Sequence, residues 1–435
     1  MKTLLAFMLV LSAHAACLAD IIVVDWERGS DETGTGSWSS PYATIQKGCD
    51  EATPGDEVRC RPGAYSEKVT ITVSGTEDQP ITIRGWSSAG PTLDGTGVPM
   101  EGRPQLLRLK GNWLVLRDFE VRDSLGAGIG IAGNNCTVTG NIVTECRYAG
   151  ITCRPEMTDF VENNRIVGNQ VYVNCKMNKS YALQSGWPSA IGITAGRNCE
   201  VSDNDVHSNY GEGINVVRGS SNCVIAENEV HDNYSVNIYL DSASWCVIRD
   251  NLIYETNTDY IEHAGKGYRI IANGVSLADE REGYGLSRNN RITDNIIYRC
   301  RRGITYQHYE VPNSGVKGLT VTRNAIIDCW DYGIKISDAP GHVGSLFQTN
   351  VISINRDTYE YAISYRGGDK NMRWKKNVVW VEDGSDADLI DYDGVVYPTV
   401  SSWNGLYGGN ISNNVYDDPV DYLPGWVVDI LLDLL

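Results

Sequence analysis

The chain has 435 residues and a formal net charge of −18 at neutral pH, with 42% hydrophobic and 21% charged residues. This acidic balance argues against a nucleic-acid partner and is typical of a solvated, secreted surface. The 45 glycines and only 4 phenylalanines indicate a chain with many turns, and its length fits a single domain only if the fold grows by repetition.

The first twenty residues, MKTLLAFMLVLSAHAACLAD, combine a basic residue, an apolar run and small residues. This pattern predicts a signal peptide over residues 1–19, cleaved after Ala19 or alternatively after Ala15, and therefore a secreted protein, extracellular or periplasmic. A lipoprotein signal at Cys17 is a further alternative, although His14 stands where such signals usually carry an aliphatic residue. The apolar run is too short to span a membrane as a mature helix.

Residues 20–104 begin with an apolar segment, IIVVD, and a cluster of Gly, Ser and Thr. The stretch Tyr42–Ala52 predicts a short amphipathic helix, and the PGDEV segment after it turns the chain into a strand. A helix at this place would cover the open end of a stacked fold, where backbone groups are otherwise unpaired. We therefore expect residues 20–104 to form an N-terminal cap and the first rungs.

One phrase recurs over residues 105–415 and is clearest where Asn204, Asn228 and Asn251 are spaced 24 and 23 residues apart. Apolar residues lie three positions before and two positions after each marker asparagine, an alternation typical of strands rather than helices. A Gly-Ile pair or its equivalent follows. The markers are Asn141, Asn169, Asn204, Asn228, Asn251, Asn295, Asn324 and Asn350.

Strands this short, with no helices between them, must pair with their counterparts one repeat away, which makes a parallel β-helix. The repeats resemble those of the right-handed parallel β-helix superfamily, which includes the pectate-lyase-like secreted carbohydrate-active proteins. The resemblance implies an all-β, single-domain, right-handed solenoid. It implies no one reaction, because the scaffold hosts lyases, glycosidases, epimerases and phage adhesins.

The cysteines follow the same repeat. Cys199, Cys223 and Cys246 each lie five residues before a marker asparagine. Such locked positions favour a buried column of free thiols, although the spacing of adjacent rungs would also allow disulfides. Cys49 and Cys60 lie outside this column, and we expect them to form a disulfide.

Two rungs carry long insertions at the same corner of the repeat. The distance from marker to Gly-Ile strand is 10 residues in most rungs and 24 in two, which places insertions at Lys176–Ser189 and approximately Thr256–Ile271. Insertions in solenoids tend to lie on the binding face. We expect these two to flank a groove floored by Asn215, Tyr239, Asp241 and Ser276; decorative loops or self-association are the alternatives.

Charged and aromatic residues near this groove are the candidate site. Lys266 or His263 is predicted as a base, with Tyr239 as a further candidate, and Asp241 as the organiser of charge. Asp241 and Asp279, on adjacent rungs, with Glu212 nearby, suggest either a Ca²⁺ site or a pair of carboxyl groups with separated pKa values. The predicted substrate-binding residues are Asn215, Arg218, Arg302, Trp187, His308 and Lys335.

Polysaccharide cleavage is the predicted function, with a uronate polymer split by β-elimination as the preferred reaction. That reaction needs a base and a cation that neutralises the uronate carboxylate. Hydrolysis by Asp241 with Asp279 or Glu212 is an alternative, and so is a non-catalytic carbohydrate-binding or surface protein. No membrane or nucleic-acid partner is expected, and the protein is predicted to be a monomer.

Two other patterns remain. A row of rings three residues after the markers, Tyr172, His207, His231, Tyr254 and Tyr298, predicts a stacked surface ladder, with sugar stacking or metal binding as the alternative. The end of the chain, residues 416–435, contains an amphipathic segment that is too short and too charged to span a bilayer and is expected to be a C-terminal cap.

Overall fold

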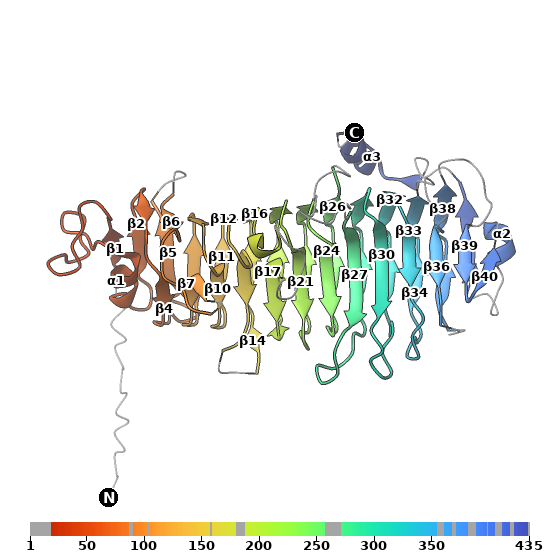
Figure 1. The fold of residues 1–435 in the computed structure, drawn as a ribbon, viewed down its shortest axis with the longest axis horizontal. Helices are drawn as coiled ribbons and strands as arrows, with labels where there is room; N and C mark the ends of the chain where they lie inside the picture. The colour runs from red at the N-terminus through yellow and green to blue at the C-terminus, as the bar shows by residue number, and fades with distance from the viewer. Residues whose placement is uncertain are drawn as a thin grey trace, which may run out of the picture.

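The computed structural model describes residues 19–86, 90–102, 104–156, 159–179, 188–256, 271–354, 361–367, 371–381, 389–397, 399–404, 411–417 and 422–433. Throughout this part of the chain, short strands stack into three long sheets that enclose one core (Figure 1). The molecule is elongated, with the first rungs at one end and the last at the other. The predicted all-β, single-domain parallel β-helix is confirmed.

The three sheets are named in the order in which each rung visits them, and their strands are counted over the described residues. Sheet I has 14 strands: β1 (Ile21–Val24), β2 (Glu57–Cys60), β5 (Ile81–Gly85), β8 (Leu114–Arg117), β11 (Thr137–Thr139), β15 (Arg165–Val167), β19 (Glu200–Ser202), β22 (Val224–Ala226), β25 (Val247–Arg249), β28 (Arg291–Thr293), β31 (Thr320–Thr322), β34 (Leu346–Gln348), β37 (Arg373–Lys375) and β41 (Ile411–Ser412). Sheet II has 13: β3 (Ala64–Tyr65), β6 (Thr92–Asp94), β9 (Glu120–Arg122), β12 (Ile142–Thr144), β16 (Gln170–Tyr172), β20 (Asp205–His207), β23 (Glu229–His231), β26 (Leu252–Tyr254), β29 (Ile296–Tyr298), β32 (Ala325–Cys329), β35 (Val351–Ile354), β38 (Val378–Val381) and β42 (Val415–Tyr416).

Sheet III also has 13 described strands: β4 (Val69–Ile71), β7 (Gln105–Leu109), β10 (Ala127–Ile131), β13 (Ile151–Cys153), β17 (Ser189–Thr194), β21 (Glu212–Val217), β24 (Val236–Asp241), β27 (Asn273–Asp279), β30 (Arg302–His308), β33 (Tyr332–Ile336), β36 (Ile363–Tyr365), β39 (Ile390–Tyr392) and β40 (Val395–Tyr397). Its last pair, β39 and β40, is antiparallel. A small separate sheet joins β14 (Val161–Glu162) to β18 (Gly196–Arg197).

The core consists of columns of identical or similar side chains. Val206 pairs with Val230, and Val230 with Ile253, and all three side chains are fully buried. The predicted stacking of these residues in one column is therefore confirmed. Burying apolar surface stabilises a fold by about 25 cal/mol per Å², so each further rung of a column adds to the stability of the molecule.

The marker asparagines form a second kind of column at the corner between sheets I and II. The side-chain amide of Asn204 donates to Oδ1 of Asn228, and that of Asn228 to Oδ1 of Asn251, each at 2.9 Å. The residue before each marker turns the corner in the left-handed region, for example Asp203 with φ of 56°. The recurring asparagine thus satisfies buried backbone and side-chain polar groups at a sharp turn.

The ends of the stack are covered by different helices. At the N-terminal end α1 (Ile45–Asp50), capped by Thr44, packs against β1, β2 and β4, as expected from the sequence. At the C-terminal end α2 (Val400–Trp403) buries Trp403 against Trp374 with ring centroids 5.6 Å apart. A short 3₁₀ helix, η1 (Lys176–Asn178), follows β16.

The last helix, α3 (Gly425–Asp433), does not cover the end, contrary to the cap expected for residues 416–435. It lies along the side of the stack, where Val427 packs against Ile296 and Ala325 of sheet II (Figure 1). The apolar face of α3 therefore finds its partners on the outer surface of sheet II. Among the described helices, none has the length and apolar composition needed to cross a membrane.

Cysteines in the described residues are all free and all buried. Cys199, Cys223 and Cys246 occupy the predicted buried column. The expected Cys49–Cys60 disulfide is wrong: Cys49 of α1 and Cys60 of β2 are free thiols packed as small apolar groups in the core.

Candidate active site on the outer face of sheet III

The Gly-Ile pairs explain which side chains reach the outer face of sheet III. A Cβ at Gly213 would lie 2.9 Å from the core atom Cγ1 of Val230, so this position must be glycine. Glycine and the isoleucine after it both face the core, and the residues on either side of the pair both face outward. Glu212 and Asn215, three residues apart, therefore touch on the outer face, with Nδ2 of Asn215 donating to Oε2 of Glu212 at 2.8 Å.

One outer row crosses five strands in register. Asn215 pairs with Tyr239, Tyr239 with Ser276, Ser276 with Thr305, and Thr305 with Lys335; the row runs from β21 to β33. The structure thus places three of the four predicted floor residues side by side. Although they face outward, Ser276 and Thr305 have almost no exposed surface.

Asp241, the fourth predicted floor residue, lies on the same face two residues further along β24. Its Oδ1 accepts hydrogen bonds from the Ser242 hydroxyl and the backbone N–H of Glu280, both at 2.9 Å. Its partner across the ladder is Ala278 rather than Asp279. The carboxylate of Asp241 is therefore held at the end of β24, facing outward.

The predicted pairing of Asp241 with Asp279 is wrong. Asp279 is completely buried, and its carboxylate accepts from the backbone N–H of Ser287 at 2.6 Å. It lies one position out of register with Asp241, and in a strand a shift of one residue turns a side chain to the opposite face. His308, which pairs with Asp279, is on this inner side as well and is not placed to bind substrate on the outer face.

A Ca²⁺ site built from Asp241, Asp279 and Glu212 has the same difficulty, because Asp279 faces away from the other two. Burial raises the pKa of Asp279, while hydrogen bonds from the N–H groups of Ser287 and Gly315 lower it. Because both of its oxygens accept backbone hydrogen bonds, Asp279 has a structural role. Within the described residues, no group of three or more His, Cys, Asp or Glu side chains is placed to hold a metal ion. These residues do not fit the predicted cation.

Glu212 is the most perturbed acid on the outer face. Burial raises its pKa to about 8; the hydrogen bond from Asn215 opposes this, and the negative charges of Glu280 and Asp241 add to it. The side chain is almost fully buried. Glu212 therefore keeps its proton at neutral pH.

Tyr239 donates its hydroxyl proton to Oε1 of Glu280 at 2.6 Å. Burial, then the charges of Glu280, Glu212 and Asp241, raises the pKa of Tyr239 far above its usual value. The same causes raise the pKa of Tyr309. A tyrosine in these surroundings holds its proton, so Tyr239 is a hydrogen-bond donor and not the base that the sequence suggested.

Two buried polar atoms beside Ser276 lack a hydrogen-bond partner among the described residues. They are Oδ1 of Asn273, whose Nδ2 donates to Ser276 at 3.3 Å, and the hydroxyl of Thr305. An unpaired buried polar atom costs roughly 1–3 kcal/mol, and such atoms mark sites where a ligand or water belongs.

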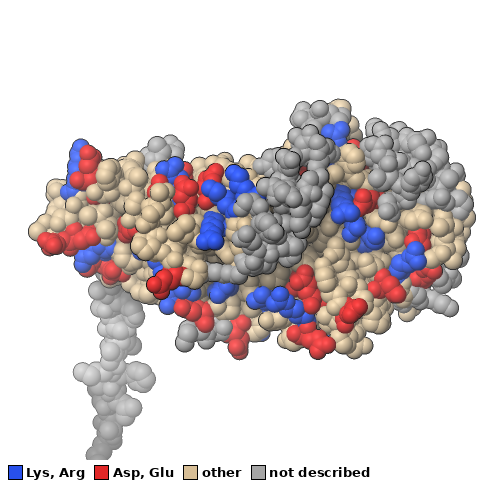
Figure 2. Space-filling model, in the orientation of Figure 1, with Lys and Arg blue, Asp and Glu red and all other residues tan. Residues whose placement is uncertain are grey.

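The predicted cations lie toward the edges of the acidic group. Arg302, at the outer start of β30, is 3.6 Å from the carboxylate of Asp331, and Nζ of Lys335 lies 4.0 Å from the ring centre of Tyr332. Arg218 follows β21, with its guanidinium 5.8 Å from the ring centre of Tyr284. Acidic and basic side chains are interspersed over the face shown in Figure 2. Although the chain has a net charge of −18, this face therefore carries positive groups that can bind an anion.

Several predicted residues lie outside the described residues: Lys266, His263 and Trp187, with most of the two insertions that carry them. The ends of those insertions are described, and they join sheet II to sheet III between β16 and β17 and between β26 and β27. Whether the insertions flank the face stays a prediction.

The sequence reasoning missed Asn273, Glu280 and Tyr309. Counting in twos along β27 from Ser276 gives Ala278 and then Glu280, so strand periodicity alone carried the signal for Glu280. Grouping Asp241 with Asp279 combined residues from opposite faces of their strands, because Asp241 pairs with Ala278 and not with Asp279.

The structure is thus a solenoid in which the outer face of sheet III is polar and includes buried polar atoms without a hydrogen-bond partner among the described residues. Residues 27–192 match the family model described as "Pel9A-like, right handed beta helix region", and residues 173–379 match the model described as "Right handed beta helix region". Together the two matches span residues 27–379, so the chain is a right-handed parallel β-helix protein.

Individual relatives are distant. The uncharacterized protein YwoF of Bacillus subtilis (strain 168) is 28% identical over 110 residues, which are 24% of this chain and 23% of that protein, so the match spans about a quarter of the relative's length. The Dettilon tailspike protein superposes with a TM-score of 0.55 at 14% identity, covering 85% of this chain and 68% of the other.

Two carbohydrate-active proteins are also similar in structure. XylC in complex with xylose has a TM-score of 0.50 at 12% identity, covering 86% of both chains. An alginate lyase from Paenibacillus sp. str. FPU-7 has a TM-score of 0.48 at 16% identity, covering 70% of this chain and 94% of the other. At such identities the similarity shows the fold alone.

Proposed function

We propose that the protein degrades a uronate-containing polysaccharide on the outer face of sheet III, with Glu212 as the general acid. The observation that carries the proposal is a buried, protonated Glu212 on the same face as the carboxyl groups of Asp241 and Glu280. Carboxyl groups whose pKa values are pushed apart are the usual pair for cleaving a glycosidic bond. The open polar atoms of Asn273 and Thr305 support substrate binding beside them.

Hydrolysis is the reaction that the described residues support best. Glu212 gives its proton to the glycosidic oxygen as the bond from the sugar carbon to that oxygen breaks. Asp241 or Glu280 takes a proton from the water that forms the new bond to the same carbon. Tyr239, hydrogen-bonded to Glu280, holds that carboxylate in place.

Elimination is the second candidate, favoured by the cations Arg302 and Lys335 at the edge of the same face. Here a base removes the proton next to the uronate carboxylate, and the electrons form a carbon–carbon double bond as the glycosidic oxygen leaves with the proton of Glu212. The predicted bases for this route are Lys266 and His263.

Polymer assays with two readouts test the proposal. Purified protein is incubated with polygalacturonate, alginate and neutral xylan, and both new reducing ends and ultraviolet absorbance of an unsaturated product are followed. Reducing ends without absorbance indicate hydrolysis, and both signals together indicate elimination. Activity should fall as pH rises past about 8, where Glu212 loses its proton. No signal on any acidic polymer would overturn the proposal in favour of a binding protein.

A further inference from the structure

Trp245 stands at a corner position that carries asparagine or glycine in the other rungs from β11 to β34. Its backbone N–H donates to the carbonyl of Arg288, one rung on, at 2.9 Å, just as Asn222 donates to Ser244. Its φ is 60°, and the equivalent residues share this left-handed conformation. From β11 to β34 these equivalents are Asn135, Asn163, Asn198, Asn222, Asn289, Gly318 and Gly344.

The left-handed conformation suits asparagine and glycine and disfavours a bulky aromatic residue. Trp245 is also 58% exposed, so packing in the core does not account for it. A residue in a disfavoured conformation with an exposed apolar ring indicates a functional role. The other tryptophan at this corner position, Trp113, is only half-exposed and lies near the first rungs.

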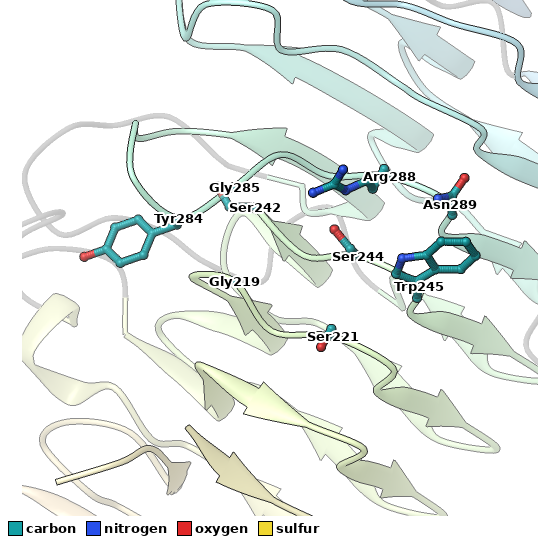
Figure 3. Close-up of a pocket in the computed structure, with 9 residues that line it drawn as sticks. All are labelled: Gly219, Ser221, Ser242, Ser244, Trp245, Tyr284, Gly285, Arg288 and Asn289. Atoms are coloured by element: carbon teal, nitrogen blue, oxygen red, sulfur yellow. The ribbon is translucent and has the colours of Figure 1, made fainter. Parts of the chain in front are cut away.

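A pocket of about 330 Å³ lies beside Trp245, at the corner where the chain passes from sheet III to sheet I. Figure 3 shows Tyr284 on one side of this pocket and Trp245 on the other, with Arg288 and Ser244 between them. Tyr284 is 40% exposed. The loop that carries it is fixed against Gly219, where a Cβ would lie 3.0 Å from the carbonyl oxygen of Tyr284.

The polar groups of the pocket are suited to an anion. Its lining includes Arg288 and no carboxylate, in a chain of net charge −18. Within the described part of the chain, Arg288 forms no ion pair, and the side chains of Ser221 and Asn289 form no hydrogen bond. A guanidinium presents a planar pair of donors that matches a carboxylate.

We infer that this corner pocket binds one uronic acid unit of an oligosaccharide, outside the catalytic face. The ring of Trp245 stacks on the apolar face of the sugar, Arg288 pairs with its carboxylate, and Ser221 and Asn289 bind its hydroxyl groups. Ser242, which lines the pocket, directly follows Asp241 of the proposed active site, so one polymer chain can reach both. The binding itself does not depend on any catalytic step.

The test is calorimetry with short oligosaccharides. Tetragalacturonate and tetramannuronate are the acidic probes, and cellotetraose is the neutral one. All proteins carry Glu212→Gln so that no probe is cleaved. Calorimetry counts sites as well as affinities, so loss of the corner site is visible even where the outer face of sheet III also binds.

Trp245→Asn is the decisive variant, because it installs the residue that other rungs carry. It should remove one site or weaken it at least about ten-fold while leaving the unfolding temperature unchanged or higher. Arg288→Gln should weaken the acidic probes and not cellotetraose. Trp113→Asn, at the equivalent position without the pocket, should bind like the parent protein.

Several results would overturn the inference. They are an unchanged number of sites and affinity in Trp245→Asn, a lowered unfolding temperature in that variant, or equal effects of Arg288→Gln on acidic and neutral probes. Because the assay measures binding in a protein without its catalytic acid, a failure of the proposed polysaccharide cleavage leaves the result interpretable.

Discussion

The outer faces of sheets II and III are built by the same repeat, yet sheet II carries a ladder of stacked rings and sheet III carries a buried acid with a raised pKa. On sheet II the rings of Tyr172, His207, His231 and Tyr254 stack at centroid distances of 5.1, 4.9 and 4.5 Å, with planes within 9° of parallel. Nδ1 of His231 lies 2.8 Å from Asp232, and the hydroxyl of Tyr254 donates to Glu229. On the same face, Oδ1 of Asp205 and the hydroxyl of Thr144 are buried without a hydrogen-bond partner among the described residues.

On sheet III the perturbed group is an acid. Burial and the charges of Glu280 and Asp241 raise the pKa of Glu212, and buried oxygens of Asn273 and Thr305 have no hydrogen-bond partner among the described residues. Such an arrangement costs stability and persists where it serves binding or catalysis. The difference indicates that the ring ladder of sheet II is structural and that the chemistry belongs to sheet III.

The largest expected effect is on activity. Glu212→Gln should lower kcat/KM on the polymer that is cleaved by roughly 10²–10⁴-fold, because the amide cannot donate the proton that the leaving oxygen needs. The matched control is Glu229→Gln on sheet II, which should keep full activity. The measurement is initial rates with both proteins checked for native unfolding temperature. Equal losses in the two variants would remove the distinction between the faces.

The second effect is on stability, and it separates Glu212 from an ordinary carboxyl group. Its pKa rises from 4.5 when unfolded to about 8 when folded, so folding is favoured by its proton. This contribution is fully present below about pH 4.5 and is lost as pH rises toward 8, at up to about 1.4 kcal/mol per pH unit.

Denaturant unfolding of the parent protein and Glu212→Gln, between pH 5 and 9, measures how the contribution of Glu212 to stability depends on pH. The parent should lose stability relative to the variant as pH rises, because glutamine has no proton to lose. Parallel curves would mean that Glu212 is not held in its protonated form.

The sequence predicted the fold well because the repeat is local and redundant: a column such as Val206, Val230 and Ile253 is visible from spacing alone. It also placed Asn215, Tyr239 and Ser276 in one row. It failed at Asp279, because a one-residue difference in offset reverses the face of a strand and charge alone does not show the offset. It did not predict the raised pKa of Glu212, which arises from burial and from the charge of Glu280, a residue two rungs away.

The smallest expected effect tests whether the ladder of sheet II is only structural. His207→Gln removes two ring contacts and should cost about 1 kcal/mol of unfolding free energy near pH 7.5, with no change in turnover.

Burial lowers the pKa of His207, against the opposing charge of Asp205, so protonation favours the unfolded chain. The stability that His207 contributes is therefore present above its unfolded pKa of 6.5 and is lost as pH falls through the lowered value. The deficit of the variant should accordingly narrow at pH 5, opposite in sign to the behaviour of Glu212. A loss of turnover in His207→Gln without a loss of stability would move the chemistry to sheet II, since a purely structural ring can lower activity only by loosening the fold.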